Sequence, residues 1–380
     1  MRLGQKVLLV SNTDWYLYNY RLSLARFLRN EGFDVVLASP SGRYASHLLN
    51  EGFRWHSVPI TRRGTFPPRE VVSLLGMIWL YARERPSVVH HFTIKPVLYG
   101  SLAAKISGVR GIVNSVTGLG YLFHSPSTSM RLARRIIRPF YRLALSGRNV
   151  KVIFENEADR QALIQMGLVE QERTVIVQGV GVDLDRYLNL PEPDGIPNIV
   201  MAGRMLWDKG VREFVEAARN LKAKGIEARF ILVGAPDPGN PSTIPVSQIQ
   251  RWMEEGIIEW WGHREDMPLV LAKSHVVTLP SYSEGLPTVL LEAAASGRPI
   301  LATDIPGCRD VVRQGETGLL VPLGDQQAYE AALERLIREP ELRRRMGETG
   351  RQWAESRFDQ QIINEQTLRV YHQVWGQSGK

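Results

Sequence analysis

The 380-residue sequence lacks the means to form an internal disulfide, because it contains one cysteine, Cys308. We therefore exclude a small secreted scaffold held by disulfides and expect the reducing cytoplasm as the compartment. Long hydrophobic runs are also missing, since the longest uncharged apolar stretch, residues 71–82, covers 12 residues, whereas a spanning helix needs roughly 20. The chain enters a strand-like run at residues 7–10 without a signal-peptide core. No secretion signal or transmembrane helix is expected.

Acidic residues are absent from one long interval. Between Glu84 and Glu155 there is no Asp or Glu, although 11 Lys and Arg occur there. Residues 1–190 hold 25 basic and 13 acidic residues, a net charge of +12, and residues 191–380 hold 22 and 26, a net charge of −4. This asymmetry indicates that the N-terminal half meets an anionic partner, namely nucleic acid, an acidic membrane or a phosphorylated substrate.

Short β-branched runs alternate with helical patterns in two series. The first series comprises residues 7–10, 35–38, 88–92, 112–116, 150–154 and 175–178, and the second comprises residues 199–202, 229–233, 257–260, 276–279 and 299–302. Short strands separated by helices indicate βαβ crossovers and parallel sheets. The predicted fold class is α/β, with two doubly wound Rossmann-like domains.

A change in composition marks the border between the two series. Residues 190–197 contain three Pro, one Gly and two acidic residues, a composition typical of a linker, and the hinge is predicted near residues 183–197. The predicted domains are residues 1–185, residues 186–358, and a C-terminal helix over residues 359–380 that packs back on the first domain. Residues 235–241, with three Pro, are predicted to be an exposed loop.

The segment around residues 279–293 has the pattern of an anion site. A strand ends at Leu279, a Gly- and Pro-containing turn follows, and a helix is predicted to begin near Pro287. Free backbone N–H groups at Gly285, Leu286 and Thr288 would point out of the start of this helix.

Two carboxylates flank the same segment. Glu284 precedes the helix and Glu292 lies within it, so they could hold hydroxyl groups at the two ends of a sugar nucleotide. The alternative, equally weighted on these residues alone, is that Glu284 caps the helix and Glu292 is a solvated helical acid.

A second cluster follows the first strand of the second series. Arg204 offers a bidentate fork and Lys209 a point charge, a pair suited to a diphosphate, while Gly203 and Gly210 let the backbone approach a ligand. Ligands of open α/β sheets bind at the carboxyl ends of strands, where this cluster is predicted to lie. The alternative is a surface Arg and Lys in a polar loop.

Together these motifs resemble retaining glycosyltransferases of family 4, which have the GT-B fold of two Rossmann-like domains facing a central cleft. The resemblance rests on Gly203-Arg204, Lys209-Gly210 and the Glu284–Glu292 pair within Ser283-Glu284-Gly285-Leu286-Pro287, and extends over nearly the whole chain. The N-terminal part, with residues 18–22, Lys95 and residues 117–120, is similar to the branch that adds N-acetylhexosamine to undecaprenyl-diphosphate-linked sugars.

The resemblance implies roles for matching positions. Arg204 and Lys209 would bind the donor diphosphate and stabilise the departing nucleoside diphosphate, Glu284 would contact the donor sugar, and Glu292 the ribose. The residues implied in donor binding are Gly203, Arg264, Gly285, Leu286, Pro287, Thr288 and Glu292. The implied reaction is front-face transfer with retention, in which the leaving phosphate oxygen helps to deprotonate the acceptor hydroxyl.

The acceptor is assigned to the N-terminal domain. The candidate residues on this side are Asn12, Asp14, Lys95, Thr117 and Gly118, of which Lys95 could meet a lipid diphosphate. His90 and His91 lie on a neighbouring strand end, and a buried structural role is favoured for both.

No metal or other cofactor is expected, and a UDP-sugar is the expected donor. Asp183-Leu184-Asp185 has the form of a metal-binding DxD, but it follows Gly179-Val180-Gly181 near the predicted hinge and is interpreted as a turn and helix cap. No His and Cys cluster has metal-ligand spacing. Nothing around Cys308 indicates a catalytic thiol.

One helix of the basic interval is a candidate for attachment to an anionic membrane. Arg131, Arg134, Arg135, Arg138 and Arg142 recur at helical spacing, with apolar residues available to other faces. The alternative is a solvated face of an ordinary core helix. The expected location is cytoplasmic, peripheral on the inner face of the cell membrane.

The predicted function is therefore transfer of a sugar, an N-acetylhexosamine, from a UDP-sugar to a lipid-diphosphate-linked saccharide in surface polysaccharide or glycoprotein glycan assembly. A UDP-sugar epimerase on the same fold is one alternative. A basic nucleic-acid-binding protein is an alternative of another class, but no nucleic-acid partner is expected because the basic interval lacks a recognised RNA- or DNA-reading motif.

Overall fold

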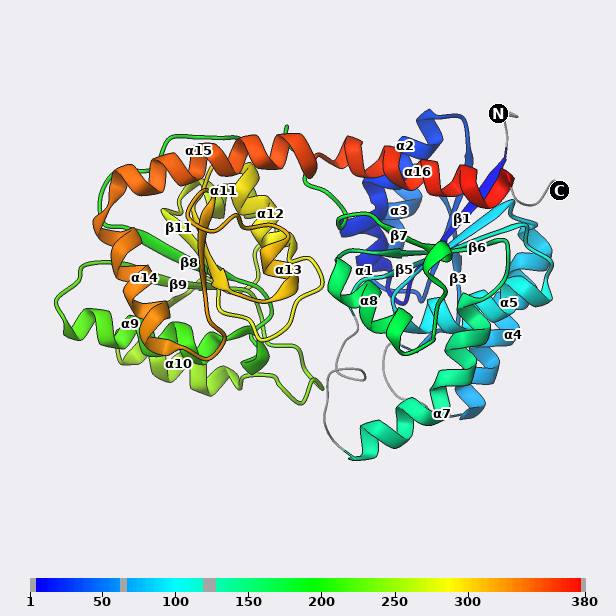
Figure 1. The fold of residues 1–380 in the computed structure, drawn as a ribbon, viewed down its shortest axis with the longest axis horizontal. Helices are drawn as coiled ribbons and strands as arrows, with labels where there is room; N and C mark the ends of the chain where they lie inside the picture. Colours follow the sequence, from blue (N-terminus) through cyan, green and yellow to red (C-terminus); the bar gives the residue numbers. More distant parts are fainter. Residues whose placement is uncertain (1–4, 62–66, 119–127, 377–380) are drawn as a thin grey trace. The chain divides into compact units, whose positions relative to one another are not determined.

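The computed structural model describes residues 5–61, 67–118 and 128–376, with side chains for all of them except residues 67, 128–136 and 376. It divides into two compact units (Figure 1). Unit 1 comprises Met1–Val180 and Gln361–Lys380, and unit 2 comprises Gly181–Gln360. The chain thus enters unit 2 ahead of the boundary predicted at residue 185 and returns to unit 1 close to residue 359.

Unit 1 contains a seven-stranded parallel sheet with the order β3-β2-β1-β4-β5-β6-β7. The strands are β1 Lys6–Val10, β2 Asp34–Ser39, β3 Arg54–Ser57, β4 Val88–Phe92, β5 Gly111–Val116, β6 Val150–Phe154 and β7 Thr174–Ile176. The helices are α1 Asp14–Tyr16, α2 Leu22–Asn30, α3 Ala45–Asn50, α4 Pro67–Glu84, α5 Ser101–Ile106, α7 Thr128–Leu145, α8 Glu157–Gln165 and α16 Gln360–Gly376. π-helical turns occupy Leu17–Arg21 and Pro96–Gly100, and a 3-10 turn occupies Gln171–Arg173.

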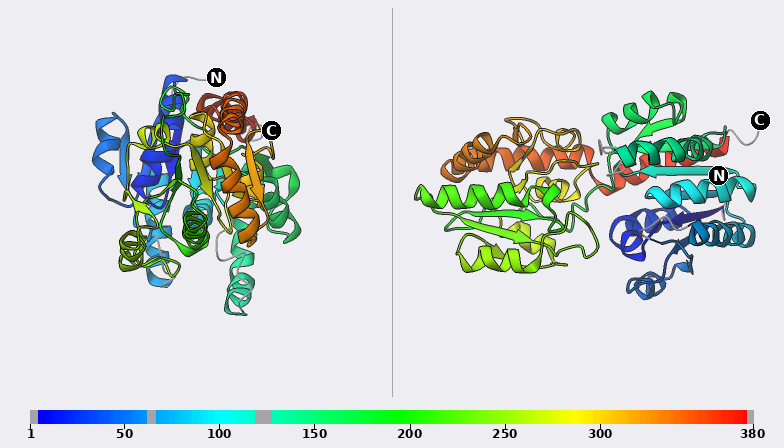
Figure 2. Two further views of the ribbon diagram at one scale, coloured as in Figure 1. Left: turned by 90° about the vertical axis from the view of Figure 1, so that its left-hand side faces the viewer. Right: turned by 90° about the horizontal axis from the view of Figure 1, so that it is seen from below.

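Both faces of this sheet are covered by helices, which explains its continuous apolar strands (Figure 2). Alternate residues of β1 enter different cores. Leu8 packs in a cluster with Leu80 of α4, whereas Leu9 packs in a cluster with Leu28 of α2 and Tyr371 of α16.

Unit 2 contains a six-stranded parallel sheet with the order β10-β9-β8-β11-β12-β13. The strands are β8 Asn198–Ala202, β9 Arg229–Val233, β10 Glu259–Trp260, β11 Val276–Leu279, β12 Ile300–Thr303 and β13 Gly318–Val321. The helices are α9 Val211–Ala223, α10 Val246–Glu254, α11 Met267–Ala272, α12 Thr288–Ala295, α13 Pro306–Arg309, α14 Gln326–Arg338 and α15 Pro340–Arg357, with a 3-10 turn at Trp207–Lys209. Numbered within the unit, this strand order is 3-2-1-4-5-6, that of a Rossmann domain.

The last two helices belong to different units. α15 ends at Arg357, and α16 starts at Gln360, so the predicted break near residues 357–359 is confirmed. Ile363, Val370 and Tyr371 of α16 are buried in the core of unit 1. The prediction of two doubly wound domains and a C-terminal helix that crosses back is confirmed.

Two strands were not predicted from the sequence. β3 is a polar edge strand, Arg-Trp-His-Ser, with no residue fully buried, and β13 has four residues directly after a Gly-containing turn. The Pro-rich segment predicted as the hinge lies within unit 2, where Glu192 accepts a hydrogen bond from Arg343 Nε at 3.0 Å. Its composition reflects an irregular segment anchored to its own unit.

Candidate functional site

Three loops of unit 2 meet at the carboxyl edge of neighbouring strands. Residues 203–209 follow β8, residues 234–245 follow β9, and residues 280–287 follow β11, and β8 lies between β9 and β11 in the sheet. Parallel strands bring their carboxyl ends to one edge, where ligands of this fold bind. The predicted Arg204 and Glu284 clusters therefore share one edge.

A glycine lets two of these loops touch. Gly210 has a φ of 80°, and a Cβ at this position would lie 2.0 Å from the carbonyl oxygen of Pro280. Beside this contact, the backbone N–H of Tyr282 donates to the carbonyl oxygen of Asp208 at 3.0 Å. The close approach requires a residue without a Cβ, and it brings Lys209 to the loop that carries Glu284.

Lys209 and Glu284 form an ion pair within this edge. Lys209 Nζ lies 2.6 and 2.7 Å from the two carboxylate oxygens of Glu284, and the two side chains are 19% and 10% exposed. The loop with Glu284 rests on Gly307 of α13, where a Cβ would lie 2.7 Å from the Glu284 carbonyl oxygen. Glu284 thus binds a lysine, and the alternative in which it only caps α12 is wrong.

Arg204 also has a carboxylate partner. Its Nη1 donates to Oδ2 of Asp237 at 2.8 Å, and the arginine side chain is 52% exposed whereas the aspartate side chain is 9% exposed. The loop of residues 235–241, predicted as exposed, therefore contains a buried acid. No feature of the sequence indicated this partner, which is 33 residues away.

The start of α12 lies where the sequence placed it. Pro287 precedes the first helical residue, Thr288, and no side chain caps the helix start. Leu286 and Pro287 are buried, while Gly285 and Thr288 are partly exposed. The N-terminal end of a helix attracts anions, so this position suits a phosphate group.

Glu292 is not a solvated helical acid. It is partly buried on α12 and accepts a hydrogen bond from the hydroxyl of Tyr187 at 2.7 Å. Burial raises the pKa of Glu292 to about 7, although the Tyr187 hydrogen bond and the positive charge of Arg186 act in the opposite direction. Sequence reasoning missed Tyr187 because 105 residues separate it from Glu292.

Arg264 and Gly203 are exposed at this edge. Arg264 is exposed and pairs with Asp266, with Nε 2.7 Å from Oδ1. Gly262 accepts the N–H of Gly234 at 2.7 Å, and a Cβ on Gly234 would lie 1.8 Å from the carbonyl oxygen of Gly203. The loops after β8, β9 and β10 are thus in close contact through their glycines.

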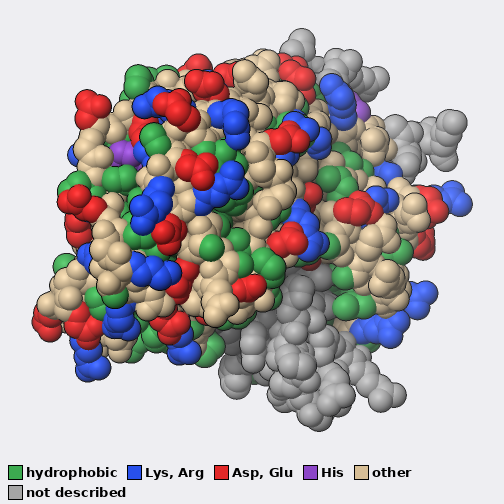
Figure 3. All heavy atoms as spheres, turned by 60° about the vertical axis from the view of Figure 1, so that its left-hand side comes forward, with side chains coloured by type: hydrophobic (Ala, Val, Ile, Leu, Met, Phe, Trp, Pro, Cys, Tyr) green, Lys and Arg blue, Asp and Glu red, His purple; other side chains and the backbone are tan. Residues whose placement is uncertain are grey.

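Both charge signs are mixed on the face of the molecule shown in Figure 3. Exposed residues of unit 2 also form ion pairs, such as Arg229 with Glu259 at 2.7 Å. The case for an anion site therefore depends on the local cations Arg204 and Lys209.

In unit 1 two predicted acceptor residues have structural partners. The Asp14 carboxylate accepts the N–H groups of Trp15 and Tyr44 at 2.8 Å and of Ala45 at 2.9 Å, and it is buried. It holds the start of α3, a role that carboxylates commonly fill. Asp14 thus has a structural role at the start of α3, and the acceptor contact stays a prediction.

Lys95 is likewise paired. Its Nζ lies 2.6 Å from both Glu70 Oε1 and Thr61 Oγ1, and the Lys95 side chain is 15% exposed. Any anion at Lys95 must compete with Glu70. Asn12, Thr117 and Gly118 are partly exposed at the ends of β1 and β5 and keep their place as candidates.

His90 and His91 are structural, as predicted. His90 contacts Tyr371 Oη and Ser115 Oγ at 2.7 Å, and His91 contacts Tyr81 Oη and Asn114 Oδ1 at 2.9 Å. Burial lowers the pKa of His91 to about 4 and holds that of His90 well below its usual range.

Asp183 Oδ1 accepts the N–H groups of Asp185 and Arg186 at 3.1 and 3.0 Å, so the DxD forms a turn, as predicted. The residues between this turn and β8, all of which the structure describes, form no helix, so the predicted helix cap is wrong. Cys308 is buried, and burial raises the pKa of its thiol, which opposes thiolate formation.

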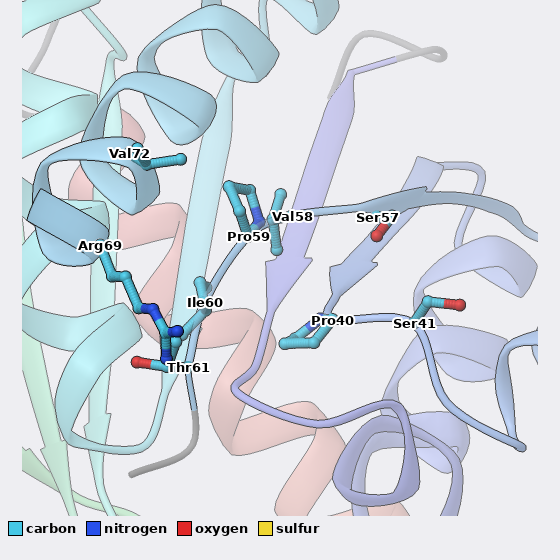
Figure 4. A pocket seen from close by; sticks show the side chains of 9 residues that line it. All are labelled: Pro40, Ser41, Ser57, Val58, Pro59, Ile60, Thr61, Arg69 and Val72. Carbon is cyan, nitrogen blue, oxygen red and sulfur yellow. The ribbon is translucent and has the colours of Figure 1, made fainter. Parts of the chain in front are cut away.

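A shallow pocket of about 400 Å³ lies after β2 and β3 in unit 1 (Figure 4). It is lined mainly by apolar side chains, and Figure 4 shows Arg69 of α4 extending toward Thr61. The lining residues are Pro40, Ser41, Ser57, Val58, Pro59, Ile60, Thr61, Arg69 and Val72. No local pattern predicts this pocket, because its residues come from separate segments.

α4 also exposes an apolar stripe that continues from this pocket. Val71, Val72, Leu75 and Trp79 recur at helical spacing and are 54–59% exposed. On α7, Arg138 and Arg142 are exposed beside the exposed Phe140 and Leu143, whereas Arg131, Arg134 and Arg135 lie outside the described side chains. Within the helices that the structure describes, none is long and apolar enough to cross a membrane.

Two family models match the sequence. The model described as "Glycosyl transferases group 1" matches residues 196–339, and the model described as "Glycosyl transferase 4-like" matches residues 6–156. The first range contains Arg204, Lys209, Glu284 and Glu292, and the two ranges together cover most of the chain.

Named relatives point in the same direction. The N,N'-diacetylbacillosaminyl-diphospho-undecaprenol alpha-1,3-N-acetylgalactosaminyltransferase of Campylobacter jejuni is 26% identical over 98% of this chain and 99% of its own. The UDP-Gal:alpha-D-GlcNAc-diphosphoundecaprenol alpha-1,3-galactosyltransferase of Escherichia coli is 24% identical over 83% and 84%. The sucrose-phosphate synthase structure of Thermosynechococcus elongatus has a TM-score of 0.81 at 18% identity, covering 98% and 99%, and shows a shared fold. The comparisons do not support the epimerase alternative.

Proposed function

Because this chain belongs to the glycosyltransferases of family 4, with the GT-B fold, we propose that it transfers a sugar from a UDP-sugar to a lipid-diphosphate-linked saccharide. An N-acetylhexosamine is the proposed sugar, and surface polysaccharide or glycoprotein glycan assembly the proposed context. The names of the Campylobacter and Escherichia relatives, which act on undecaprenol-diphosphate-linked sugars, support this acceptor class.

One observation carries the proposal. A cationic loop with Arg204 and Lys209, the uncapped start of α12 and the carboxylate of Glu284 lie along one carboxyl edge of the unit 2 sheet. The carboxylate of Glu292 follows within α12. Cations and a helix start suit a diphosphate, whereas carboxylates suit sugar hydroxyl groups. This combination matches a nucleotide sugar better than a nucleic acid, which would be read through an extended basic surface.

The proposed reaction retains the donor's anomeric configuration. The acceptor oxygen attacks the anomeric carbon on the face from which the bond to the β-phosphate oxygen breaks, and the acceptor proton passes to that departing oxygen. Arg204 and Lys209 stabilise the negative charge that develops on UDP, while Glu284 and Glu292 position the sugar and the ribose. We propose that these cations suffice without a metal ion.

Transfer assays test this function. Purified chain is incubated with a panel of UDP-sugars and with diphosphoundecaprenol-linked monosaccharides, with and without EDTA, and the products are analysed by mass spectrometry and NMR. The proposal predicts one extended lipid-linked product with an α linkage in both conditions. An inverted linkage contradicts retention, loss of product in EDTA contradicts metal independence, and hydrolysis or epimerisation without transfer contradicts the function itself.

We further propose that unit 1 attaches peripherally to the anionic inner face of the cell membrane. The apolar stripe of α4 ends in Arg83, whose guanidinium lies 5.1 Å from the centre of the Trp79 ring, and Arg69 lies near its other end. Apolar residues flanked by arginines suit the interface of an anionic bilayer. Arg138 and Arg142 on α7 add positive charge beside Phe140 and Leu143.

Flotation with vesicles tests the attachment. Wild-type chain is expected to float with vesicles of phosphatidylcholine and phosphatidylglycerol and to be released by high salt. Leu75→Glu and Trp79→Ala should reduce flotation, whereas Leu49→Ser, which alters another exposed leucine of unit 1, should not. Equal flotation of all variants, or none by the wild type, contradicts the proposal.

A further inference from the structure

Asp237 carries a charge at the unit 2 edge that none of the proposed roles uses. It lies in the loop after β9, and its side chain is 9% exposed. Burying a carboxylate costs several kcal/mol unless it is compensated. The ion pair with Arg204 at 2.8 Å offsets part of this cost.

The loop around Asp237 is interlocked with the loop that carries the cations. The N–H of Met205 donates to the carbonyl oxygen of Ala235 at 3.0 Å. The N–H of Ile244 donates to the carbonyl oxygen of Met205, also at 3.0 Å. Leu206 and Thr243 form an antiparallel bridge. The two loops thus behave as one small hydrogen-bonded unit, and its geometry determines where Arg204 points.

Side-chain hydrogen bonds also stabilise this arrangement of the two loops, near Asp237 and near Asp208. Asp237 N–H donates to Thr243 Oγ1 at 3.0 Å, which orients the aspartate within its loop. At the other end Ser242 Oγ donates to Asp208 Oδ1 at 2.8 Å and accepts the Asp208 N–H at 3.1 Å. Asp208 directly precedes Lys209, so the loop after β9 contacts Arg204 and the residue next to Lys209.

The contact with Arg204 leaves the guanidinium available. Asp237 engages Nη1, and among the described residues Nε and Nη2 make no hydrogen bond. A guanidinium held at one nitrogen has a restricted orientation and still offers donors for a bidentate contact with phosphate. A free, half-exposed arginine would lose rotamer entropy on binding, and the aspartate reduces that loss.

We propose that Asp237 is a positioning residue that holds the guanidinium of Arg204 ready for the diphosphate of the donor. The inference rests on the proposed function, since it needs Arg204 to contact a nucleoside diphosphate. Asp237 itself touches neither substrate in this account and acts through Arg204.

A double-mutant cycle tests it with UDP as the probe. UDP affinity by calorimetry and kcat of transfer are measured for wild type, Asp237→Ala, Arg204→Ala and the double variant. Asp237→Ala should lower kcat roughly tenfold to a hundredfold, because small misplacements of a charge-stabilising group are costly. In the Arg204→Ala background the same change should alter kcat by less than about twofold.

Two further variants separate positioning from folding. Asp237→Asn keeps an acceptor oxygen without the charge and should recover part of the lost kcat. Glu255→Ala removes the partner of Arg219, an exposed pair of the same unit at 2.8 Å, and should leave transfer unchanged. Melting curves recorded alongside report whether each variant is folded.

The outcomes distinguish this inference from the proposed function. An Asp237→Ala variant that is folded and fully active, or an equal loss in both arginine backgrounds, overturns the positioning role while the function stands. Absence of UDP binding and transfer in the wild type overturns the proposed function and this inference with it.

Discussion

Lys209 Nζ lies within 2.7 Å of both carboxylate oxygens of Glu284, although 75 residues separate the two in the chain. The contact depends on backbone packing, because Gly210 lets the Lys209 loop touch Pro280. The resulting pair places a positive and a negative group side by side at the carboxyl edge of the unit 2 sheet. It can contact an anion and a hydroxyl group of the same ligand.

Removing one member of this pair should separate its structural and functional contributions. Lys209→Met leaves the largely buried Glu284 without its partner, and we expect the free energy of unfolding to fall by about 1–3 kcal/mol. Lys209→Met with Glu284→Gln should recover much of that stability but no transfer activity. Lys222→Met, an exposed lysine of the same unit, serves as control, and denaturant titrations give the values.

The raised pKa of Glu292 predicts that the stability of the chain depends on pH. This pKa is raised from 4.5 to about 7, so the folded chain binds this proton more tightly than the unfolded chain does. The stability of the wild type should therefore decline relative to that of Glu292→Gln as pH rises from 4.5 to about 7, by roughly 2–3 kcal/mol. Denaturant titrations at each pH measure the stability of both proteins. If the two stability curves run parallel, the carboxyl group has an ordinary pKa and the prediction is wrong.

Gly210 gives a prediction about backbone packing. Gly210→Ala places a Cβ against the Pro280 carbonyl at a φ of 80°, so we expect about 3 kcal/mol of destabilisation and loss of transfer. Gly225→Ala is the matched control, because its φ is 74° and its Cβ would meet no atom within 4 Å. The control should cost about 1 kcal/mol and remain active. Similar losses in the two variants would contradict a role for the close contact.

His91 should make unit 1 sensitive to acid. Because its pKa falls from 6.5 to about 4 on burial, the stability associated with neutral His91 is present above pH 6.5 and lost as pH falls toward 4. The stability advantage of the wild type over His91→Gln should therefore shrink across this range, by up to about 3 kcal/mol. Comparing the variants removes the contribution of His90, which both retain. A constant difference from pH 7 to 4 would contradict the buried neutral form.

Local patterns predicted the elements, and long-range contacts could not be predicted from them. Runs of β-branched residues located the central strands, and Pro287 marked the start of α12. The polar edge strand β3 was not predicted, because its residues do not alternate clearly between buried and exposed.

The same is true of the candidate site, where residues in local motifs were predicted and their long-range partners were not. Arg204, Lys209, Glu284 and Glu292 stood out through their motif, whereas Asp237 and Tyr187 owe their importance to partners 33 and 105 residues away. Lys95 shows the converse, since a lysine that looked free in sequence is neutralised by Glu70 from α4.

Calorimetric titration of the full chain with UDP tests whether the carboxyl edge of the unit 2 sheet, where Arg204 lies, binds the donor diphosphate. We expect the wild type to bind UDP and Arg204→Ala to weaken binding at least about tenfold, because a charge-assisted contact is worth over about 1 kcal/mol. Arg219→Ala, which removes a similarly exposed arginine, should bind UDP as the wild type does. Equal affinity of the wild type and the folded Arg204→Ala variant would contradict diphosphate binding at this edge.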